Sequence, residues 1–288
     1  MKIIDIITSS KPSLSFEVFP PKTSDAFDTV REATEKIAML RPSFMSVTYG
    51  AGGGTSEYTV SVAKNIKDNC GVDTIAHLTC INSSKDDIHL RLEALKNAGI
   101  ENILALRGDI TLENRDKIKF DYKHASELAM DISNYGGFCI GGACYPEIHP
   151  ESANQKEDIL NLKLKVEAGC QFLTTQMFFD NNLFYNFMYK IREAGITVPV
   201  IAGIMPITNA NQIDRAIKLS GSYIPQRFKA LVDRYGSNPQ AMSQAGIAYA
   251  TDQIIDLYAN GINAVHVYSM NKEYVAGNIK KNISEIIK

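Results

Sequence analysis

Short apolar runs recur along the whole chain, and most of them end in polar or charged residues. The eight runs cover residues 14–19, 44–49, 74–80, 102–107, 138–145, 172–178, 198–204 and 264–270. The residues at or just past their ends are mostly polar or charged, with two glycines among them: Glu17, Thr48, Tyr49, Gly50, His77, Arg107, Gly108, Asp109, Tyr145, His149, Gln176 and Lys272. Strands that alternate with helices and carry polar or charged residues at their carboxyl ends are typical of a (β/α)8 TIM barrel, so we predict this α/β fold.

Helical patterns fill the intervals between the apolar runs. They are predicted at residues 25–40, 55–67, 86–98, 154–168 and 181–194, the second after a Gly52-Gly53-Gly54 turn. The order helix, glycine, strand recurs at Gly99, Gly169 and Gly195, as in the αβ loops of a parallel fold. Pro225 and the 236–239 segment interrupt the long stretch 213–258. We therefore predict extra helices inserted between strands seven and eight.

Composition narrows the class of protein. A length of 288 residues fits one barrel domain over 1–288, because such barrels take about 250 residues. A formal net charge of -2 gives no indication of a nucleic-acid or membrane partner. Asp5 interrupts the apolar core that a signal peptide needs, so we expect a cytoplasmic protein. The five cysteines form no Cys-x-x-Cys pair, and we expect neither a disulfide framework nor a metal site.

Glu17 is a candidate general acid. Strand alternation places its side chain on the face opposite Phe16 and Val18, toward the barrel mouth. An acid in an apolar mouth loses hydration, which raises its pKa and suits it to donate a proton near neutral pH. The alternative is a strand-end glutamate paired with a cation such as Arg107.

The Arg107-Gly108-Asp109 segment is a candidate ligand site. Gly108 permits a tight turn and the close approach of a flat ligand. Arg107 offers two donors to a phosphate or carboxylate, and Asp109 can accept from ring N–H groups. An internal ion pair between Arg107 and Asp109 would explain the same residues without any ligand.

Further candidates lie in and after the third, fifth and sixth runs. Two prolines stiffen the 145–150 loop, which carries Tyr145, Glu147 and His149 and is either a ligand loop or a well-ordered surface loop. Gln176 offers a neutral amide to a planar ring edge. His77, alone in an apolar strand, is more often a hydrogen-bonded core residue than a metal ligand. The remaining candidates share one helix face, which is either solvated or lines a cofactor: Asp158, Asn161 and Lys165.

These motifs resemble one known family. The segments Ser-Phe-Glu-Val-Phe-Pro-Pro-Lys (15–22), Val-Thr-Tyr-Gly-Ala (47–51), Ala-His-Leu-Thr-Cys (76–80), Leu-Arg-Gly-Asp (106–109), Tyr-Pro-Glu-Ile-His-Pro (145–150) and Thr-Gln-Met-Phe-Phe-Asp (175–180) are similar to methylenetetrahydrofolate reductase of the bacterial single-domain type. The resemblance implies a barrel that binds FAD, takes hydride from NADH or NADPH, and reduces 5,10-methylenetetrahydrofolate to 5-methyltetrahydrofolate. The product donates methyl groups for methionine synthesis. The flavin would carry out the hydride transfer, and the protein would position the flavin and the substrate and set their electrostatic environment.

The resemblance also implies residue roles. Glu17 matches the general acid that assists opening of the folate five-membered ring, and Asp109 matches an acid that binds folate and tunes the flavin. The FAD contacts would be Thr48, Tyr49, His77, Arg107, Gly108, Asp109, His124, Ala125, Tyr145, His149, Asp158, Asn161 and Lys165. The folate contacts would be Glu17, Asp109, Gln176, Gln212 and Lys272. We expect a homo-oligomer, because this state is common among proteins of this class.

The chain departs from the family pattern at four positions. Lys272 stands where the bacterial pattern has arginine, which keeps the charge but loses the planar pair of donors. His124 replaces a tyrosine next to the flavin, and Leu164 replaces a basic helix residue. Ala216 falls where a folate-stacking aromatic is expected. The appended regulatory domain of eukaryotic members has no counterpart, so inhibition by S-adenosylmethionine is not expected.

Three other functions share some of these features. A different flavin barrel, such as a proline dehydrogenase, would need contacts for a small amino acid. A hydrolase that uses Glu17 and Glu147 would need their carboxyl groups about 5–10 Å apart across an open cleft. A binding protein could keep the fold without turnover, although the presence of Glu17, Asp109 and Gln176 together argues against that.

Overall fold

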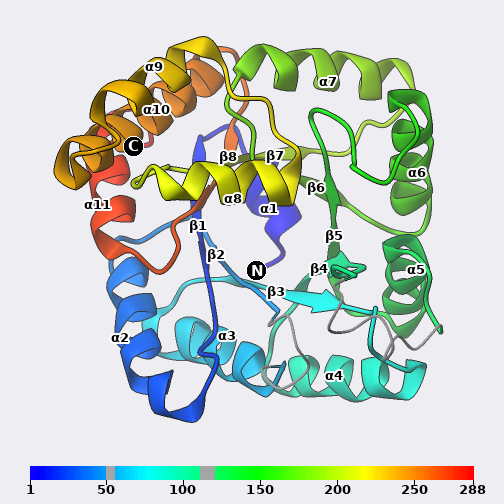
Figure 1. Cartoon of the computed structure of the whole chain (residues 1–288). Coiled ribbons are helices and arrows are strands. Elements are labelled where there is room, and N and C mark those ends of the chain that lie inside the picture. The colour runs from blue at the N-terminus through cyan, green and yellow to red at the C-terminus, as the bar shows by residue number, and fades with distance from the viewer. Residues whose placement is uncertain (50–55, 111–120) are drawn as a thin grey trace.

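Eight parallel strands form a closed barrel in the computed structural model, which describes residues 1–49, 56–110 and 121–288 (Figure 1). The strands are β1 (Ser13–Val18), β2 (Met45–Val47), β3 (Thr74–Thr79), β4 (Asn102–Leu106), β5 (Cys139–Cys144), β6 (Phe172–Thr175), β7 (Val200–Ile204) and β8 (Ala264–Tyr268). Each strand pairs with the next one in sequence, and β1 pairs with β8. Every predicted apolar run overlaps one of these strands, so the (β/α)8 prediction is confirmed.

Helices surround the barrel in a ring, and α8 crosses in front of the strands in Figure 1. The helices are α1 (Ile3–Ile7), α2 (Phe27–Ala38) after the 3-10 turn η1 (Ser24–Ala26), α3 (Ser56–Cys70), α4 (Lys85–Asn97), α5 (Ala125–Tyr135), α6 (Gln155–Glu167), α7 (Asn181–Glu193), α8 (Asn211–Ser220), α9 (Gln226–Tyr235), α10 (Pro239–Ala259) and α11 (Glu273–Asn282). Helices α8, α9 and α10 lie between β7 and β8. The predicted Gly52–Gly54 turn, the start of its helix at Thr55, and Gly50 lie outside the described residues.

Helices α1, α5 and α11 were not predicted from the sequence. Helix α1 spans 5 residues, too few to show a helical period. Helices α5 and α11 begin after His124 and Lys272, neither of which is among the residues preferred at an N-cap. By contrast, α6 and α7 follow Asn154 and Asp180, whose side chains accept main-chain hydrogen bonds in the first turn.

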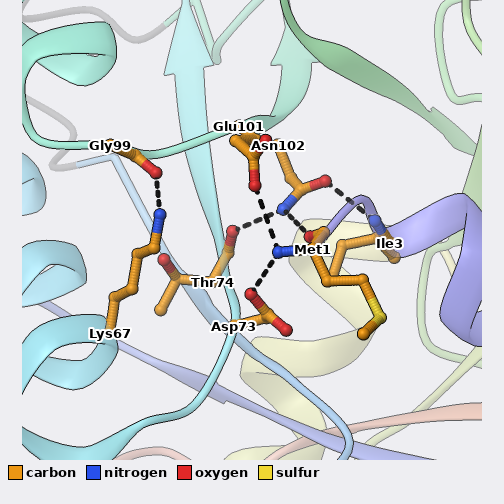
Figure 2. A network of polar contacts seen from close by, with 8 residues as sticks. All are labelled: Met1, Ile3, Lys67, Asp73, Thr74, Gly99, Glu101 and Asn102. Atoms are coloured by element: carbon orange, nitrogen blue, oxygen red, sulfur yellow. Dashed lines mark hydrogen bonds and ion pairs between the residues drawn. The ribbon is translucent and has the colours of Figure 1, made fainter.

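The N-terminal end of the barrel is closed by apolar packing. Ile3 and Ile7 of α1 form a buried cluster with residues at the strand starts, including Phe44, Phe172 and Ile201. Asn102 of β4 connects this helix to the barrel (Figure 2): its Oδ1 accepts from the Ile3 N–H at 2.8 Å, and its Nδ2 donates to the carbonyls of Met1 and Thr74, each at 3.1 Å. Because the N-terminal end of the barrel is closed, the accessible end is the mouth at the C-terminal ends of the strands.

A second cluster packs the inserted helices. Phe179, Phe228 and Tyr249 form its aromatic centre, with Ala216 buried against them. Ala216 therefore offers no stacking surface to a ligand. All five cysteines lie in the described ranges and are free thiols, and four are buried. None of the helices in these ranges combines the length and apolar character needed to cross a bilayer.

Candidate active site

The residues singled out from the sequence gather at the C-terminal ends of the strands. Glu17 and His77 lie near the ends of β1 and β3, and Thr48 and Tyr49 directly follow β2. The segment starting at Arg107 follows β4, while Tyr145 and Gln176 follow β5 and β6. Parallel strands of a barrel share one carboxyl end, so seven of the eight strand ends contribute side chains to this mouth, counting Lys272 in the turn after β8.

Glu17 is a buried acid. Only 8% of the residue is exposed, and burial raises the pKa of its carboxyl to about 8. The carboxyl is therefore mostly protonated at neutral pH, as predicted from the strand alternation. Its main-chain carbonyl accepts a hydrogen bond from Ser269 Oγ at 2.7 Å, which ties β1 to the end of β8. The alternative pairing of Glu17 with Arg107 is wrong, because Arg107 is paired elsewhere.

His77 lies beside this acid without a charge. Its Nε2 is 3.8 Å from Glu17 Oε2, and burial lowers the pKa of the imidazole to about 4. The contact is thus one between two neutral groups, rather than an ion pair. His77 Nε2 is buried and has no hydrogen-bond partner among the described residues. Buried polar atoms normally have partners, so this nitrogen is suited to a polar atom of a bound ligand.

A second histidine lies inside the barrel, one layer below. His266 of β8 is hydrogen-bonded to Ser15 Oγ through Nδ1 at 2.7 Å and to Ser46 Oγ through Nε2 at 2.8 Å. Burial lowers its pKa to about 3, with a further contribution from His77. This hydrogen-bond network was not predicted from the sequence. The available signal was the shared strand face of Ser15 and Glu17, two residues apart.

Tyr268 crosses the barrel mouth above β7. Its hydroxyl donates to the Thr175 carbonyl at 2.5 Å, and its ring is edge-on to His266. A Cβ atom at Gly203 would lie 2.4 Å from the Tyr268 hydroxyl and 2.5 Å from the Thr175 oxygen. The glycine on β7 therefore makes the space through which this tyrosine connects β8 to β6. Tyr268 is also the register neighbour of Glu17.

Arg107 forms a two-point ion pair with Glu151. Its Nη1 and Nη2 each lie 2.6 Å from a Glu151 carboxylate oxygen, and this pairing lowers the pKa of the Glu151 carboxyl. The internal Arg107–Asp109 pair considered from sequence is therefore not the main contact of the arginine. Gly108 has φ +93°, and a Cβ there would lie 2.9 Å from Ile81 Cγ2, so only glycine fits this turn.

The 145–152 loop is held by α6. The His149 N–H and the Ser152 hydroxyl donate to the two Asp158 carboxylate oxygens at 3.3 and 3.2 Å. The rings of Tyr145 and His149 meet edge to face at 4.6 Å, and burial raises the pKa of Tyr145 to about 12. Lys165 donates to the Ala143 carbonyl at 2.8 Å, and burial lowers the pKa of its ammonium group. The helix face that carries Asp158 and Lys165 thus contacts the barrel instead of being fully solvated.

The rest of this helix face and the start of α5 are more open. Asn161 is exposed, and Leu164, which replaces a basic residue of the family pattern, is 53% exposed. His124 is the exposed N-cap residue of α5, and Ala125 is the buried first residue of that helix.

The amides and the lysine form a second group on the other side of the mouth. Gln176 Oε1 accepts from the Met177 N–H at 2.8 Å, and Gln212 Oε1 accepts from the Thr208 N–H at 2.9 Å. Both amide oxygens thus accept main-chain hydrogen bonds, and the Gln176 side chain is also hydrogen-bonded to the side chain of Tyr145. Lys272 donates to Thr208 Oγ1 at 3.1 Å and so joins the loops after β7 and β8. Asp109 is an exposed residue of the β4 loop.

No group of three or more His, Cys, Asp or Glu side chains placed to hold a metal ion occurs within residues 1–49, 56–110 and 121–288. Glu147 is half-buried, and its carboxylate accepts from the Tyr223 N–H in the loop after α8. That hydrogen bond connects the 145–152 loop to the loop after α8, so Glu147 has a structural role. This argues against Glu147 as the second carboxylate of a hydrolase.

A closed parallel barrel whose C-terminal mouth carries a neutral buried acid, a neutral histidine and an arginine is typical of a TIM-barrel enzyme. The family model described as methylenetetrahydrofolate reductase matches residues 2–284. The chain belongs to the methylenetetrahydrofolate reductase family.

Individual relatives agree with the family model. The 5,10-methylenetetrahydrofolate reductase of Escherichia coli (strain K12) is 34% identical over 260 residues, which cover 90% of this chain and 86% of the relative. The methylenetetrahydrofolate reductase (NADH) 1 of Zea mays is 34% identical over 299 residues, covering 99% of this chain and 50% of the relative. The chain therefore spans about half the length of the plant relative.

Solved structures share the fold. An uncharacterized protein from Clostridium thermocellum, which binds two copies of 5-methyl-5,6,7,8-tetrahydrofolic acid, has a TM-score of 0.68 at 14% identity and covers 96% of each chain. A dihydropteroate synthase from Coxiella burnetii, in complex with pteroic acid, has a TM-score of 0.52 at 12% identity, over 97% of this chain and 95% of that one. At these identities the likeness concerns the barrel architecture alone.

Proposed function

We propose that this protein reduces 5,10-methylenetetrahydrofolate to 5-methyltetrahydrofolate, with FAD as its bound cofactor and NADH or NADPH as the reductant. The product would supply methyl groups for methionine synthesis. Membership of the family supports the folate reaction. The observation that carries the proposal is the Glu17 carboxyl, buried and protonated at neutral pH beside the unpartnered Nε2 of His77.

The residues present fit a flavin dinucleotide. Thr48, Tyr49 and His77 lie at the ends of β2 and β3, and Arg107 and Tyr145 follow β4 and β5, so these residues form a continuous arc of the mouth. The His77 Nε2 atom has no hydrogen-bond partner among the described residues and lies 3.8 Å from Glu17 Oε2, so a ligand ring with hydrogen-bonding edges would satisfy it. Arg107 supplies a planar cation for a diphosphate. Gly108 keeps the backbone free of a side chain at the β4 turn.

The remaining cofactor contacts would come from the loop and helices that border this arc. His149 is held by Asp158 and faces Tyr145 edge-on. The other proposed contacts lie on α6 and at the start of α5, namely Asn161, Lys165, His124 and Ala125. When bound, FAD would supply the hydride chemistry, and the chain would supply placement.

Glu17 would act as the proton source for the substrate. Its proton passes to a ring nitrogen of the folate while the adjacent carbon–nitrogen bond breaks, and the bonding electrons stay on that nitrogen. The methylene carbon becomes part of an iminium, which is the electrophile that accepts hydride. A carboxyl with pKa near 8 is protonated at pH 7, and it is a stronger acid than water, so it matches this task.

Asp109, Gln176, Gln212 and Lys272 would hold the folate. The Gln176 and Gln212 amide oxygens already accept main-chain hydrogen bonds, and Gln176 is also hydrogen-bonded to Tyr145. Each amide carries two N–H donors, so one or both would serve carbonyl or ring-nitrogen acceptors of the folate. Lys272 would meet the anionic glutamate end of the substrate. Since it bonds Thr208 with one of its three N–H groups, the others can serve a carboxylate.

The test is an anaerobic titration of the purified protein. We expect a yellow protein with oxidised-flavin absorbance that bleaches on addition of NADH and regains colour with 5,10-methylenetetrahydrofolate. A protein that stays colourless after reconstitution with FAD would overturn the proposal. Bleaching of the oxidised flavin by proline, with no response of the reduced flavin to the folate, would favour a proline dehydrogenase-like barrel.

A further inference from the structure

Glu151 occupies the hydrogen-bonding edge of Arg107 that a phosphate would use. Both terminal nitrogens of the guanidinium bond the Glu151 carboxylate at 2.6 Å, and Nε donates to the Gly108 carbonyl at 3.3 Å. A guanidinium has five N–H groups, and the pair on one edge matches a carboxylate or a phosphate equally well. A carboxylate of the chain itself therefore already occupies the pair of N–H donors that would bind a phosphate.

The backbone of Glu151 is fixed, whereas its side chain is exposed. The Glu151 N–H donates to His149 Nδ1 at 3.1 Å, and the Ser152 N–H donates to the His149 carbonyl at 2.9 Å. The Glu151 side chain is 55% exposed, against 20% for Arg107. The carboxylate can thus rotate into water without disturbing the turn, while the arginine stays in place.

We propose that Glu151 is an internal anion that competes with the FAD diphosphate for Arg107 and thereby sets how tightly the cofactor is held. This inference rests on the proposed function, in which Arg107 binds the diphosphate. A carboxylate and a diphosphate repel each other when both lie against one guanidinium. Cofactor binding therefore exchanges one partner of Arg107 for the other, and the lost ion pair is subtracted from the binding free energy.

The direct test is the affinity of FAD in a Glu151→Gln variant, followed by quenching of flavin fluorescence and by release of FAD on dilution. Exposed ion pairs contribute little, so we expect the Kd for FAD to fall only about two- to fivefold. The gain should shrink as ionic strength rises. Glu167→Gln, which removes the same charge at the exposed end of α6, should leave the Kd unchanged.

Riboflavin separates competition for phosphate from a general effect on the loop, because it carries the same ring system without any phosphate. Its affinity should be the same in wild type and Glu151→Gln. In an Arg107→Gln background, the effect of Glu151→Gln on FAD should vanish, since the two anions no longer share a partner.

The outcomes are distinct. Weaker or unchanged FAD binding in Glu151→Gln would overturn the inference and make Glu151 a residue that orients Arg107. An equal gain for riboflavin would also overturn it. Absence of FAD binding in wild type and variants alike would overturn both the inference and the proposed function, whereas FAD binding with no Glu151 effect leaves the proposed function standing.

Discussion

Glu17 Oε2 and His77 Nε2 face each other across 3.8 Å at the barrel mouth, and neither group is charged at neutral pH. The cause is the same for both, because burial disfavours the ionised form of an acid and of a base alike. An ion pair here would need a proton to move from a carboxyl with pKa near 8 to an imidazole with pKa near 4. The pair therefore keeps its proton on Glu17, where the proposed reaction uses it.

Replacement of Glu17 by glutamine should separate the two half-reactions. The amide keeps the shape of the neutral acid but has no proton to donate, so reduction of 5,10-methylenetetrahydrofolate should fall by at least about 100-fold, the lower end for loss of a general acid. Flavin reduction by NADH should change less than about twofold, because that step needs no proton from Glu17. Stopped-flow absorbance of the flavin measures both steps. Equal loss in both would contradict the role given to Glu17.

The raised pKa of Glu17 also predicts how folate reduction and the free energy of unfolding change with pH. The carboxyl is protonated below pH 8, so folate reduction should decline as pH rises through about 8, while flavin reduction by NADH should not follow that profile. A folded-state pKa raised above the unfolded value of 4.5 gives stability that is complete below pH 4.5 and is lost as pH rises toward 8.

Glu17→Gln should therefore be more stable than wild type at neutral pH. A rise from 4.5 to about 8 corresponds to about 3 kcal/mol at pH 7, and the difference should disappear near pH 4, where both side chains are neutral. Urea unfolding at pH 4, 7 and 9 measures this difference in the free energy of unfolding. A variant less stable than wild type at pH 9 would contradict the assigned protonation state.

Asp109→Asn should affect the substrate more than the cofactor. Asp109 is exposed on the β4 loop, so its replacement leaves the barrel core intact. We expect the KM for the folate to rise about tenfold, as for loss of one charge-assisted hydrogen bond. FAD retention should stay within about twofold of wild type, because many other contacts hold a dinucleotide. Loss of FAD that matches or exceeds the loss of folate affinity would reverse the assignment.

The strand order and the position of Glu17 could be predicted from the sequence because both follow from local rules. Apolar runs of strand length, each ended by a polar residue, mark the carboxyl ends of parallel strands. Alternation along β1 alone places Glu17 opposite Phe16 and Val18. Helices with Asn154 or Asp180 at the N-cap were likewise predictable, whereas those capped by His124 or Lys272 were not.

The partners of the polar residues could not be predicted, because they depend on contacts between distant segments. Arg107 pairs with Glu151 across 44 positions, although Asp109 is far nearer in sequence. His266 meets Ser15 from 251 positions away, and although Ser15 shares a strand face with Glu17, that alternation does not say which distant residue it meets. Barrel closure brings β8 beside β1, so these pairings become visible only when the register of all eight strands is known.

Gly203→Ala should disturb the mouth without removing any polar group. The added Cβ would lie 2.4 Å from the Tyr268 hydroxyl and 2.5 Å from the Thr175 carbonyl, so Tyr268 must leave its hydrogen bond or β7 must shift. Overpacking of this kind typically costs about 1–3 kcal/mol of unfolding free energy. Because Tyr268 adjoins Glu17 in register and bonds the residue before Gln176, folate reduction should fall more than flavin reduction by NADH.

The matched control for Gly203→Ala is Gly277→Ala in α11. The nearest atom to a Cβ at position 277 is 3.5 Å away, an ordinary contact, so the change should be neutral or stabilising by up to about 1 kcal/mol. Urea unfolding and the two flavin half-reactions should be measured for both variants. If Gly203→Ala keeps wild-type stability and both half-reactions, the barrel mouth tolerates a displaced Tyr268, and the tyrosine has no part in holding Glu17 and Gln176 in place. If Tyr268→Phe reproduces the selective loss of folate reduction, the hydrogen bond to Thr175 is the feature that matters, since phenylalanine fills the same space without the hydroxyl.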